Sequence, residues 1–337
     1  MDKKSIIVVT GAAGFIGSCM VQFLNENGYE NLIIVDDFGV EEKRTNWEAK
    51  KFINAVERQS LFEWLQTNNS TISCFIHLGA RTDTTEFNYA IHEELNVEYS
   101  KNVWHYCVEN NVPLIYASSA ATYGAGEFGY DDNHELPYKL QPLNPYGISK
   151  NEFDKWALEE ASSQPSPNGE GVCPPFWAGL KFFNVYGPNE YHKARMASMI
   201  FHGYHQIKKE GFVKLFKSHK QGFADGEQLR DFIYVKDVIK IMFWMMQEAF
   251  VTNGIYNVGT GKARSFNDLV NATFAAMDIE AQIKYIDIPE DIRDKYQYFT
   301  EAKMEKIRLA GYTSPLYSLE EGISDYVKNY LINNRYY

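Results

Sequence analysis

A tyrosine and a lysine stand four residues apart in "NPYGISK", as Tyr146 and Lys150. On a helix this spacing puts both side chains on one face, one turn apart. A free phenol has a pKa near 10, so its use as a base at neutral pH needs about 4 kcal/mol of assistance. An ammonium group about 4 Å away supplies roughly that amount. The pair therefore predicts a tyrosine that removes a hydroxyl proton while a hydride leaves the same carbon atom.

The residues before this pair make its spacing informative. Tyr204 and Lys208 have the same spacing, but nothing around them supports chemistry. Before Tyr146, an expected strand ends in "ASSAATYG" and supplies Ser118 and Ser119. Ligands of parallel sheets gather at the carboxyl ends of the strands. We therefore expect Ser119 to hold the reacting oxygen by a hydrogen bond.

A second group of candidates lies in "NEYHKARMAS", which holds His192, Lys193 and Arg195 within four positions. The chain as a whole is acidic, with a formal net charge of -11. Such a cluster is either the solvated start of a helix or a site for an anionic substrate in which Lys193 takes part in chemistry.

Three glycines follow the first expected strand in "TGAAGFIGS", as Gly11, Gly14 and Gly17. Glycine lets the backbone turn tightly against a pyrophosphate, and the helix that follows offers free N–H groups. "VDD" closes the next strand about 20 residues later, where an acidic residue binds the adenosine ribose. These features predict dinucleotide binding.

The choice between NAD and NADP stays open at this point. Asp36 alone favours NAD, because it accepts the 2′-hydroxyl and repels a 2′-phosphate. Lys43, Arg44 and Arg58 follow it and could hold that phosphate instead.

Apolar strand-like runs alternate with helical stretches through the first half of the chain, which predicts a parallel sheet covered on both faces. The expected fold class is α/β, a Rossmann-type doubly wound parallel sheet with a smaller, discontinuous C-terminal domain. We place the dinucleotide-binding domain at 1–183 with 231–258 returning to it, and the substrate-binding domain at 184–230 and 259–337.

The composition excludes several classes of protein. An acidic chain lacks the clustered cations that nucleic-acid binding needs, and neither a signal peptide nor an apolar membrane span is expected. The cysteines are scattered and predict no metal site but reduced thiols and a cytoplasmic location; they are Cys19, Cys74, Cys107 and Cys173.

Seven stretches together resemble the extended short-chain dehydrogenase/reductases of the nucleotide-sugar epimerase type. They are "TGAAGFIGS", "HLGA", "YASSAATYG", "NPYGISK", "KFFNVYGP", "LRDFIYVKDV" and "YNVGTG". The resemblance implies a bound dinucleotide, a nucleotide-sugar substrate and a homo-oligomer.

A narrower set, with "ARTDTTE", "LNVEYSKNVWHYC", "NVYGPNEYHKARMASM" and "KYQYFTEA", resembles the ADP-L-glycero-D-manno-heptose 6-epimerases of lipopolysaccharide inner-core synthesis. That family implies a tightly bound NADP that oxidises C6 of the heptose and returns the hydride to the other face of a transient aldehyde. By this resemblance Tyr146, supported by Lys150, is one acid–base group and Lys193 is the other. Burial and the neighbouring cations His192 and Arg195 are expected to lower the pKa of Lys193.

The resemblance also assigns binding positions. The cofactor positions are Gly11, Gly14, Phe15, Ile16, Gly17, Asp36, Asp37, Lys43, Arg58, Leu78, Gly79, Ala80, Arg81, Thr82, Asn96, Tyr146, Lys150 and Val185. The substrate positions are Ser119, Asn184, Arg195, His202, Phe216, Arg230 and Tyr296. A guanidinium suits a diphosphate, which gives Arg230 a physical reason to be there.

The chain departs from the family pattern in its cofactor region. Asp37 stands where the family often has asparagine beside the 2′-phosphate, whereas Lys43 and Arg58 favour that phosphate. NADP is therefore the predicted cofactor, with NAD as the alternative.

Other departures concern the substrate. Arg195 replaces a small residue, and Lys181 stands where an arginine is common. The expected loops 162–175 and 217–229 are longer than usual, and the second borders the nucleotide pocket, so ADP and UDP sugars both stay open.

Two other functions remain as alternatives. One is a different nucleotide-sugar epimerase or dehydratase, such as a UDP-hexose 4-epimerase, which would not need a base at Lys193. The other is a non-catalytic dinucleotide-binding protein, against which Ser119, Tyr146 and Lys150 argue.

Overall fold

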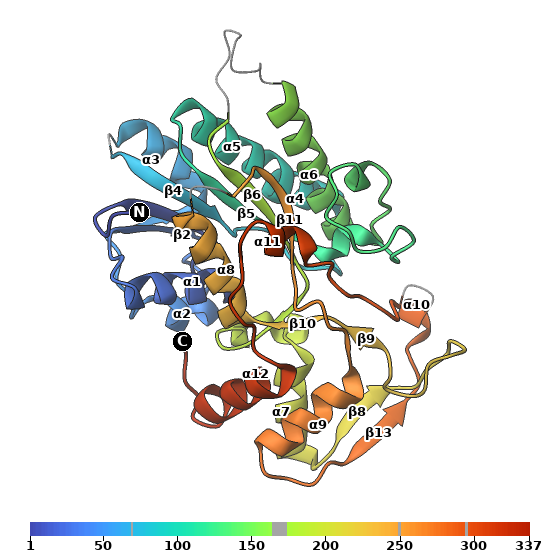
Figure 1. The fold of residues 1–337 in the computed structure, drawn as a ribbon. Helices are drawn as coiled ribbons and strands as arrows, with labels where there is room; N and C mark the ends of the chain where they lie inside the picture. Colours follow the sequence, from blue (N-terminus) through green and yellow to red (C-terminus); the bar gives the residue numbers. More distant parts are fainter. Residues whose placement is uncertain (69, 164–173, 249–250, 294–295) are drawn as a thin grey trace.

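The structure is a computed structural model that describes residues 1–68, 70–163, 174–248, 251–293 and 296–337. Within these residues seven parallel strands form one sheet in the spatial order β11-β6-β5-β4-β1-β2-β3 (Figure 1). The strands are β1 (Ile6–Thr10), β2 (Leu32–Asp36), β3 (Asn54–Glu57), β4 (Ile72–His77), β5 (Leu114–Ser119), β6 (Trp177–Phe182) and β11 (Gly254–Val258). The predicted doubly wound sheet is confirmed, and its strand order reverses between β1 and β4, where such sheets bind ligands.

Apolar side chains cover both faces of this sheet, as expected for parallel strands. Ile7 and Val9 of β1 belong to one buried cluster, and Val8 belongs to another. The first cluster includes side chains of α1 (Phe15–Glu26) and α8 (Val235–Gln247). The second includes α3 (Leu61–Thr67), α5 (Tyr99–Glu109) and α6 (Pro145–Ser163).

Three two-stranded sheets lie beyond the main sheet. They are β7 (Asn184–Tyr186) with β10 (Phe232–Tyr234), β9 (Leu229–Arg230) with β12 (Arg264–Ser265), and β8 (Val213–Phe216) with β13 (Ile283–Ile286). The helices α7 (Met199–Glu210), α9 (Phe266–Ala276) and α12 (Leu319–Tyr326) pack beside them (Figure 1). The predicted 217–229 loop joins β8 to β9. The domain boundaries stay a prediction. β11, which lies within the segment 231–258 that was expected to return to the first domain, pairs with β6 in the main sheet.

The stretch "EELNVEYSKNVWHYCVEN" does not form one regular α-helix. A π-helical segment, Glu93–Glu98, separates α4 (Tyr89–His92) from α5. Such turns often occur at functional sites. Further short α-helices are α2 (Arg44–Trp47), α10 (Glu290–Arg293) and α11 (Glu305–Leu309). A second π-helical segment spans Val327–Leu331.

Residues 164–173 lie outside the described residues. They include Cys173 and most of the predicted 162–175 loop, so the expectations for these two are not addressed by the structure. Cys19, Cys74 and Cys107 are buried and unpaired within the described part. In that part of the chain, every helix is too short or too polar to cross a lipid bilayer.

Candidate active site

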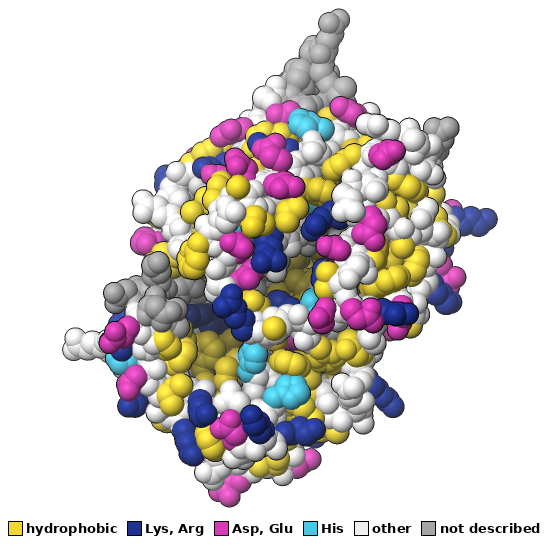
Figure 2. Space-filling model, turned by 180° about the vertical axis from the view of Figure 1, so that it is seen from behind, with side chains coloured by type: hydrophobic (Ala, Val, Ile, Leu, Met, Phe, Trp, Pro, Cys, Tyr) yellow, Lys and Arg dark blue, Asp and Glu magenta, His cyan; other side chains and the backbone are white. Residues whose placement is uncertain are grey.

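A cavity of about 740 Å³ lies at the carboxyl ends of the sheet strands. Thr10, Asp36, Leu78, Ser119 and Phe182, from the ends of five strands or the residues just after them, all line it. Figure 2 shows the surface of the molecule hollowed on one face, with Lys, Arg and His side chains around the hollow. The position at the reversal of strand order is the one expected for a nucleotide ligand.

The glycine loop forms one end of the cavity. Gly11 has a φ of 69°, and a Cβ there would lie 2.7 Å from the backbone nitrogen of Gly79. A Cβ on Gly17 would overlap the carbonyl oxygen of Gly11. Gly14 caps α1 without a side-chain hydrogen bond, so the N–H groups of the first turn remain available to an anion. These residues fit the pyrophosphate of a dinucleotide.

Asp36 stands beside this loop at the end of β2. Its carboxylate accepts hydrogen bonds from the backbone N–H of Ala13 (2.9 Å) and of Asp37 (2.8 Å). Lys43 donates to the same carboxylate at 2.9 Å. Lys43 and Arg58 line the cavity, whereas the half-exposed Asp37 lies outside the lining and 3.9 Å from Arg58. Two cations thus lie where the sequence predicts the 2′-position of the adenosine ribose.

The predicted cofactor-lining turn, 78–82, lines the cavity throughout, but Asn96 does not touch it. Asn96 is fully buried in the π-helical segment. Its amide accepts from the Arg81 N–H at 2.7 Å and donates to the Arg81 carbonyl at 3.0 Å and to the Ser149 hydroxyl at 3.0 Å. Asn96 therefore holds the turn against α6, which carries Tyr146.

His77 forms a buried polar chain that sequence reasoning missed. Ser100 donates to the Asn96 carbonyl at 2.7 Å, so the His77 Nε2–H donates to Ser100 at 2.9 Å and Thr10 donates to Nδ1 at 2.6 Å. Thr10 in turn accepts from the Gly79 N–H. Burial lowers the pKa of His77 to about 3, so the ring is neutral. A histidine inside the apolar run "SCFIHLGA" was the available signal.

Ser119, Tyr146 and Lys150 all line the cavity, as predicted. Burial raises the pKa of Tyr146, while a hydrogen bond with Ser119 acts against that rise. Lys150 donates to the Ala117 carbonyl at 2.9 Å, and burial lowers its pKa to about 8. The sequence led us to expect a phenol pKa lowered by the ammonium; in the structure burial is the larger effect and the pKa is raised.

Lys193 lines the same cavity as Tyr146, from a different element. Its Nζ lies 5.4 Å from the centre of the Phe15 ring. Burial lowers the pKa of Lys193, as expected, and Glu190 acts in the opposite direction, whereas the lowering expected from His192 and Arg195 is not found. His192 also lines the cavity, but burial lowers its pKa to about 4, so it is neutral. The expected group of three cations therefore presents one cation, Lys193, to the cavity.

Arg195 points elsewhere. Its side chain is 67% exposed, contacts Thr85 and lies 3.6 Å from Asp83. Its carbonyl is within 3.4 Å of His202, and neither residue is among the described residues that line the cavity. Ala194, between Lys193 and Arg195, has a φ of 45°, a backbone conformation that is strained for a residue with a side chain. On either side of this turn, Lys193 lines the cavity and Arg195 does not.

Three predicted substrate residues form a cluster next to the cavity. The Tyr296 ring lies 5.8 Å from Phe216 and 5.5 Å from the guanidinium of Arg230. Arg230 donates to the carbonyls of Leu229 and Gln297. Among the described residues, this cluster stands just outside the lining, to which the neighbouring Gln297 belongs. Gln297 was missed, although it follows Tyr296 in "KYQYFTEA".

Residues 7–259 match the NAD dependent epimerase/dehydratase family. This stretch is more than half of the chain and contains the glycine loop, Ser119, Tyr146, Lys150 and Lys193. The chain belongs to this family.

Relatives within the epimerase/dehydratase family match over nearly the full length. The chain is 51% identical to a Fusobacterium nucleatum protein named ADP-L-glycero-D-manno-heptose-6-epimerase, over 97% of this chain and 98% of that protein. It is 46% identical to a protein of that name from Nitratidesulfovibrio vulgaris, over 96% and 97%. A crystal structure of the Helicobacter pylori ADP-L-glycero-D-manno-heptose-6-epimerase matches with a TM-score of 0.77 and 27% identity, over 97% of both chains. The resemblance inferred from the motifs is confirmed.

For this member of the epimerase/dehydratase family, the roles of single residues stay predictions, and the structure divides the predicted residues by position. Those that line the cavity are Gly11, Gly14, Phe15, Ile16, Gly17, Asp36, Lys43, Arg58, Leu78, Gly79, Ala80, Arg81, Thr82, Ser119, Tyr146, Lys150, Asn184, Val185 and Lys193. Those that do not, within the described residues, are Asp37, Asn96, Arg195, His202, Phe216, Arg230 and Tyr296.

Proposed function

We propose that this chain is an ADP-L-glycero-D-manno-heptose 6-epimerase that works with NADP and inverts C6 of ADP-D-glycero-D-manno-heptose. The observation that carries the proposal is the position of Lys193, which lines one cavity together with Tyr146. Full-length identity of 51% to a relative with this name supports it. The product would serve lipopolysaccharide inner-core synthesis.

The cofactor would lie along the cavity from the glycine loop to Tyr146. When bound, NADP would supply hydride transfer from C6 of the sugar and back to it. The N–H groups at the start of α1 would hold the pyrophosphate. Lys43 and Arg58 would hold the 2′-phosphate, because Lys43 already neutralises the carboxylate of Asp36 that would repel it.

In the proposed mechanism, inversion of C6 uses one acid–base group on each face of this carbon. C6 is bonded to both C5 and C7, so its oxidised form is a ketone and not the aldehyde assumed from the sequence. Tyr146 would act at the C6 oxygen in one orientation of the ketone and Lys193 in the other. Burial lowers the pKa of Lys193 and raises that of Tyr146, which favours Lys193 as the base and Tyr146 as the acid in one direction of turnover.

Substrate specificity would come from residues that line the cavity and from the cluster beside it. Ser119 and Asn184 line it and would bind the sugar. Arg230, with Phe216 and Tyr296 beside it, would bind the nucleotide diphosphate. A cytoplasmic homo-oligomer is part of the proposal, and sedimentation of the purified protein tests the oligomer.

The experiment is to denature the purified protein, identify the released dinucleotide, and assay ADP-heptose beside UDP-hexoses. We expect NADP, and turnover of the ADP sugar at least a hundredfold faster than of UDP-glucose. Release of NAD would contradict the cofactor assignment alone. Preferred turnover of a UDP-hexose would favour the 4-epimerase alternative, and binding without any turnover would favour a dinucleotide-binding protein.

A further inference from the structure

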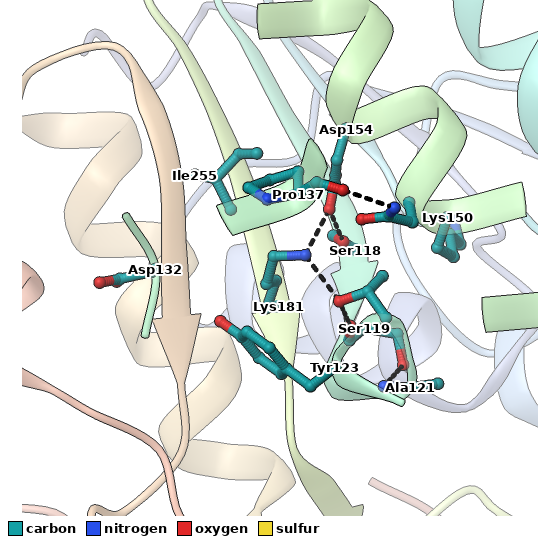
Figure 3. A network of polar contacts seen from close by, with 12 residues as sticks. Ser118, Ser119, Ala121, Tyr123, Asp132, Pro137, Lys150, Asp154, Lys181 and Ile255 are labelled. Atoms are coloured by element: carbon teal, nitrogen blue, oxygen red, sulfur yellow. Dashed lines mark hydrogen bonds and ion pairs between the residues drawn. The ribbon is translucent and has the colours of Figure 1, made fainter. Parts of the chain in front are cut away.

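A fully buried ion pair lies directly behind the candidate active site. The carboxylate of Asp154 on α6 is 2.6 Å from the ammonium of Lys181 on β6, and the two side chains are 0% and 1% exposed. Figure 3 shows them pointing toward each other between the helix and the sheet. Buried charges are costly unless they are paired and hydrogen-bonded. No role for this pair follows from the mechanism above.

Every oxygen and nitrogen of the pair has a further partner. Asp154 accepts hydrogen bonds from the Ser118 hydroxyl at 2.6 Å and from the Tyr116 hydroxyl at 3.1 Å. Lys181 also donates to the Thr122 hydroxyl at 2.7 Å. Ser118 and Thr122 lie on either side of Ser119, so the pair is bonded to the segment that carries the predicted catalytic serine.

The pair also lies in line with the two catalytic candidates of α6. Tyr146, Lys150 and Asp154 follow one another at intervals of four residues and share one face of the helix. Each contacts the end of β5: Tyr146 through Ser119, Lys150 through the Ala117 carbonyl, and Asp154 through Ser118. Three successive residues of the strand are thus joined to three successive turns of the helix.

The charge of Asp154 acts on both catalytic candidates. It opposes the burial that lowers the pKa of Lys150, and it adds to the burial that raises the pKa of Tyr146. The titratable groups facing Asp154 or Lys150 from the surrounding elements are His77 of β4, Tyr116 of β5, Lys181 of β6, and Tyr123 and His134 between β5 and α6. Burial lowers the pKa of His77 to about 3 and that of His134 to about 4, so both rings are neutral at neutral pH.

We propose that Asp154, held by Lys181, is a positioning residue that fixes α6 against the end of β5 so that Tyr146 and Lys150 meet the sugar in one geometry. The proposal rests on the function proposed above. It also sets the sign of a pH effect. In the direction of turnover in which Tyr146 is the base, Tyr146 must ionise and Lys150 must stay protonated. Removing Asp154 lowers the pKa of both groups, so both limbs of the pH profile for that direction move to lower pH.

The main test uses Asp154→Asn/Lys181→Met, which removes both charges and leaves neither unpaired. We expect a folded protein that retains its dinucleotide, a kcat lowered by about a hundredfold, a KM within threefold of the parent value and a pH optimum shifted to lower pH. Hydrogen exchange of residues 145–154 should accelerate at least tenfold, a readout that needs no substrate. Unchanged kcat, pH profile and exchange would overturn the proposal.

A milder variant keeps the test decisive if the double variant fails to fold. Tyr116→Phe removes one donor to Asp154 and no charge, and should lower kcat threefold or more with KM unchanged. Its control is Tyr256→Phe, a buried tyrosine of the neighbouring β11 whose hydroxyl contacts Thr252; this variant should keep the parent kcat. Equal kcat values for the two variants would also overturn the proposal. Failure of the parent protein to turn over ADP-heptose, with exchange still accelerated, would instead contradict the proposed function.

Discussion

Replacement of Lys193 by methionine tests the two-sided chemistry directly. Methionine has a similar length and can keep the contact with Phe15, whose ring centre lies 5.4 Å from the lysine Nζ, so the variant should fold. Removing one acid–base group typically costs a factor of about 10² to 10⁴ in rate, or about 3 to 5 kcal/mol in activation free energy. We expect kcat to fall by that factor and KM to stay within threefold.

The assay follows the conversion of ADP-D-glycero-D-manno-heptose to its C6 epimer and measures the dinucleotide released on denaturation. The matched control is Lys214→Met, which alters an exposed lysine of β8 paired with Glu210 and should leave kcat unchanged. Tyr146→Phe should reduce kcat as strongly as Lys193→Met, because each variant keeps one of the two groups. Turnover by Lys193→Met within threefold of the parent value would refute the second acid–base group. Loss of the bound dinucleotide would show that Lys193 binds cofactor instead.

Lys43, Ala194 and Asp237 each offer a further test of the structure. Lys43→Ala should lower the affinity for NADP relative to NAD by tenfold or more, since a charge-assisted phosphate contact is worth about 1.5–3 kcal/mol; titration of the dinucleotide-free protein measures it, and an unchanged ratio contradicts it. Ala194→Gly should raise the free energy of unfolding by about 1 kcal/mol, because a φ of 45° strains alanine but not glycine; urea unfolding that shows a loss would contradict this. Burial raises the folded-state pKa of Asp237 to about 6 from 3.8, so its contribution to stability falls as pH rises from about 4 to 6. Asp237→Asn should remove that fall and raise the free energy of unfolding at pH 8 by about 1–3 kcal/mol. Urea unfolding of the parent protein and the variant at about pH 4 and at pH 8 checks this.

The sequence predicted the elements whose patterns are local. The strand Ile6–Thr10, the glycine turn after it and the helix Phe15–Glu26 follow from β-branched runs, glycine spacing and helical periodicity. The convergence of Ser119 and Tyr146 was also predictable, because parallel strands end at one edge of the sheet.

Features that depend on distant partners were not predictable in the same way. Arg195 is directed outward by Asp83, more than a hundred positions earlier in the chain, and Asp154 is paired with Lys181 on another element. The raised pKa of Tyr146 comes from burial, which spacing alone does not reveal. In each case the side chain's role is set by tertiary contacts that have no local pattern.

The two acid–base candidates are held in different ways, and this difference bears on catalysis. Tyr146 lies on a long helix joined to the sheet through buried contacts. Lys193 lies in a turn whose ends are tied together, since Glu190 accepts hydrogen bonds from the backbone N–H and the hydroxyl of Ser198, each at 2.6 Å. Glu190 is itself 1% exposed and also acts on the charge of Lys193. The turn therefore holds Lys193, the proposed second acid–base group, through contacts of its own, so we expect substitutions within it to abolish inversion and to leave dinucleotide binding by the glycine loop unchanged.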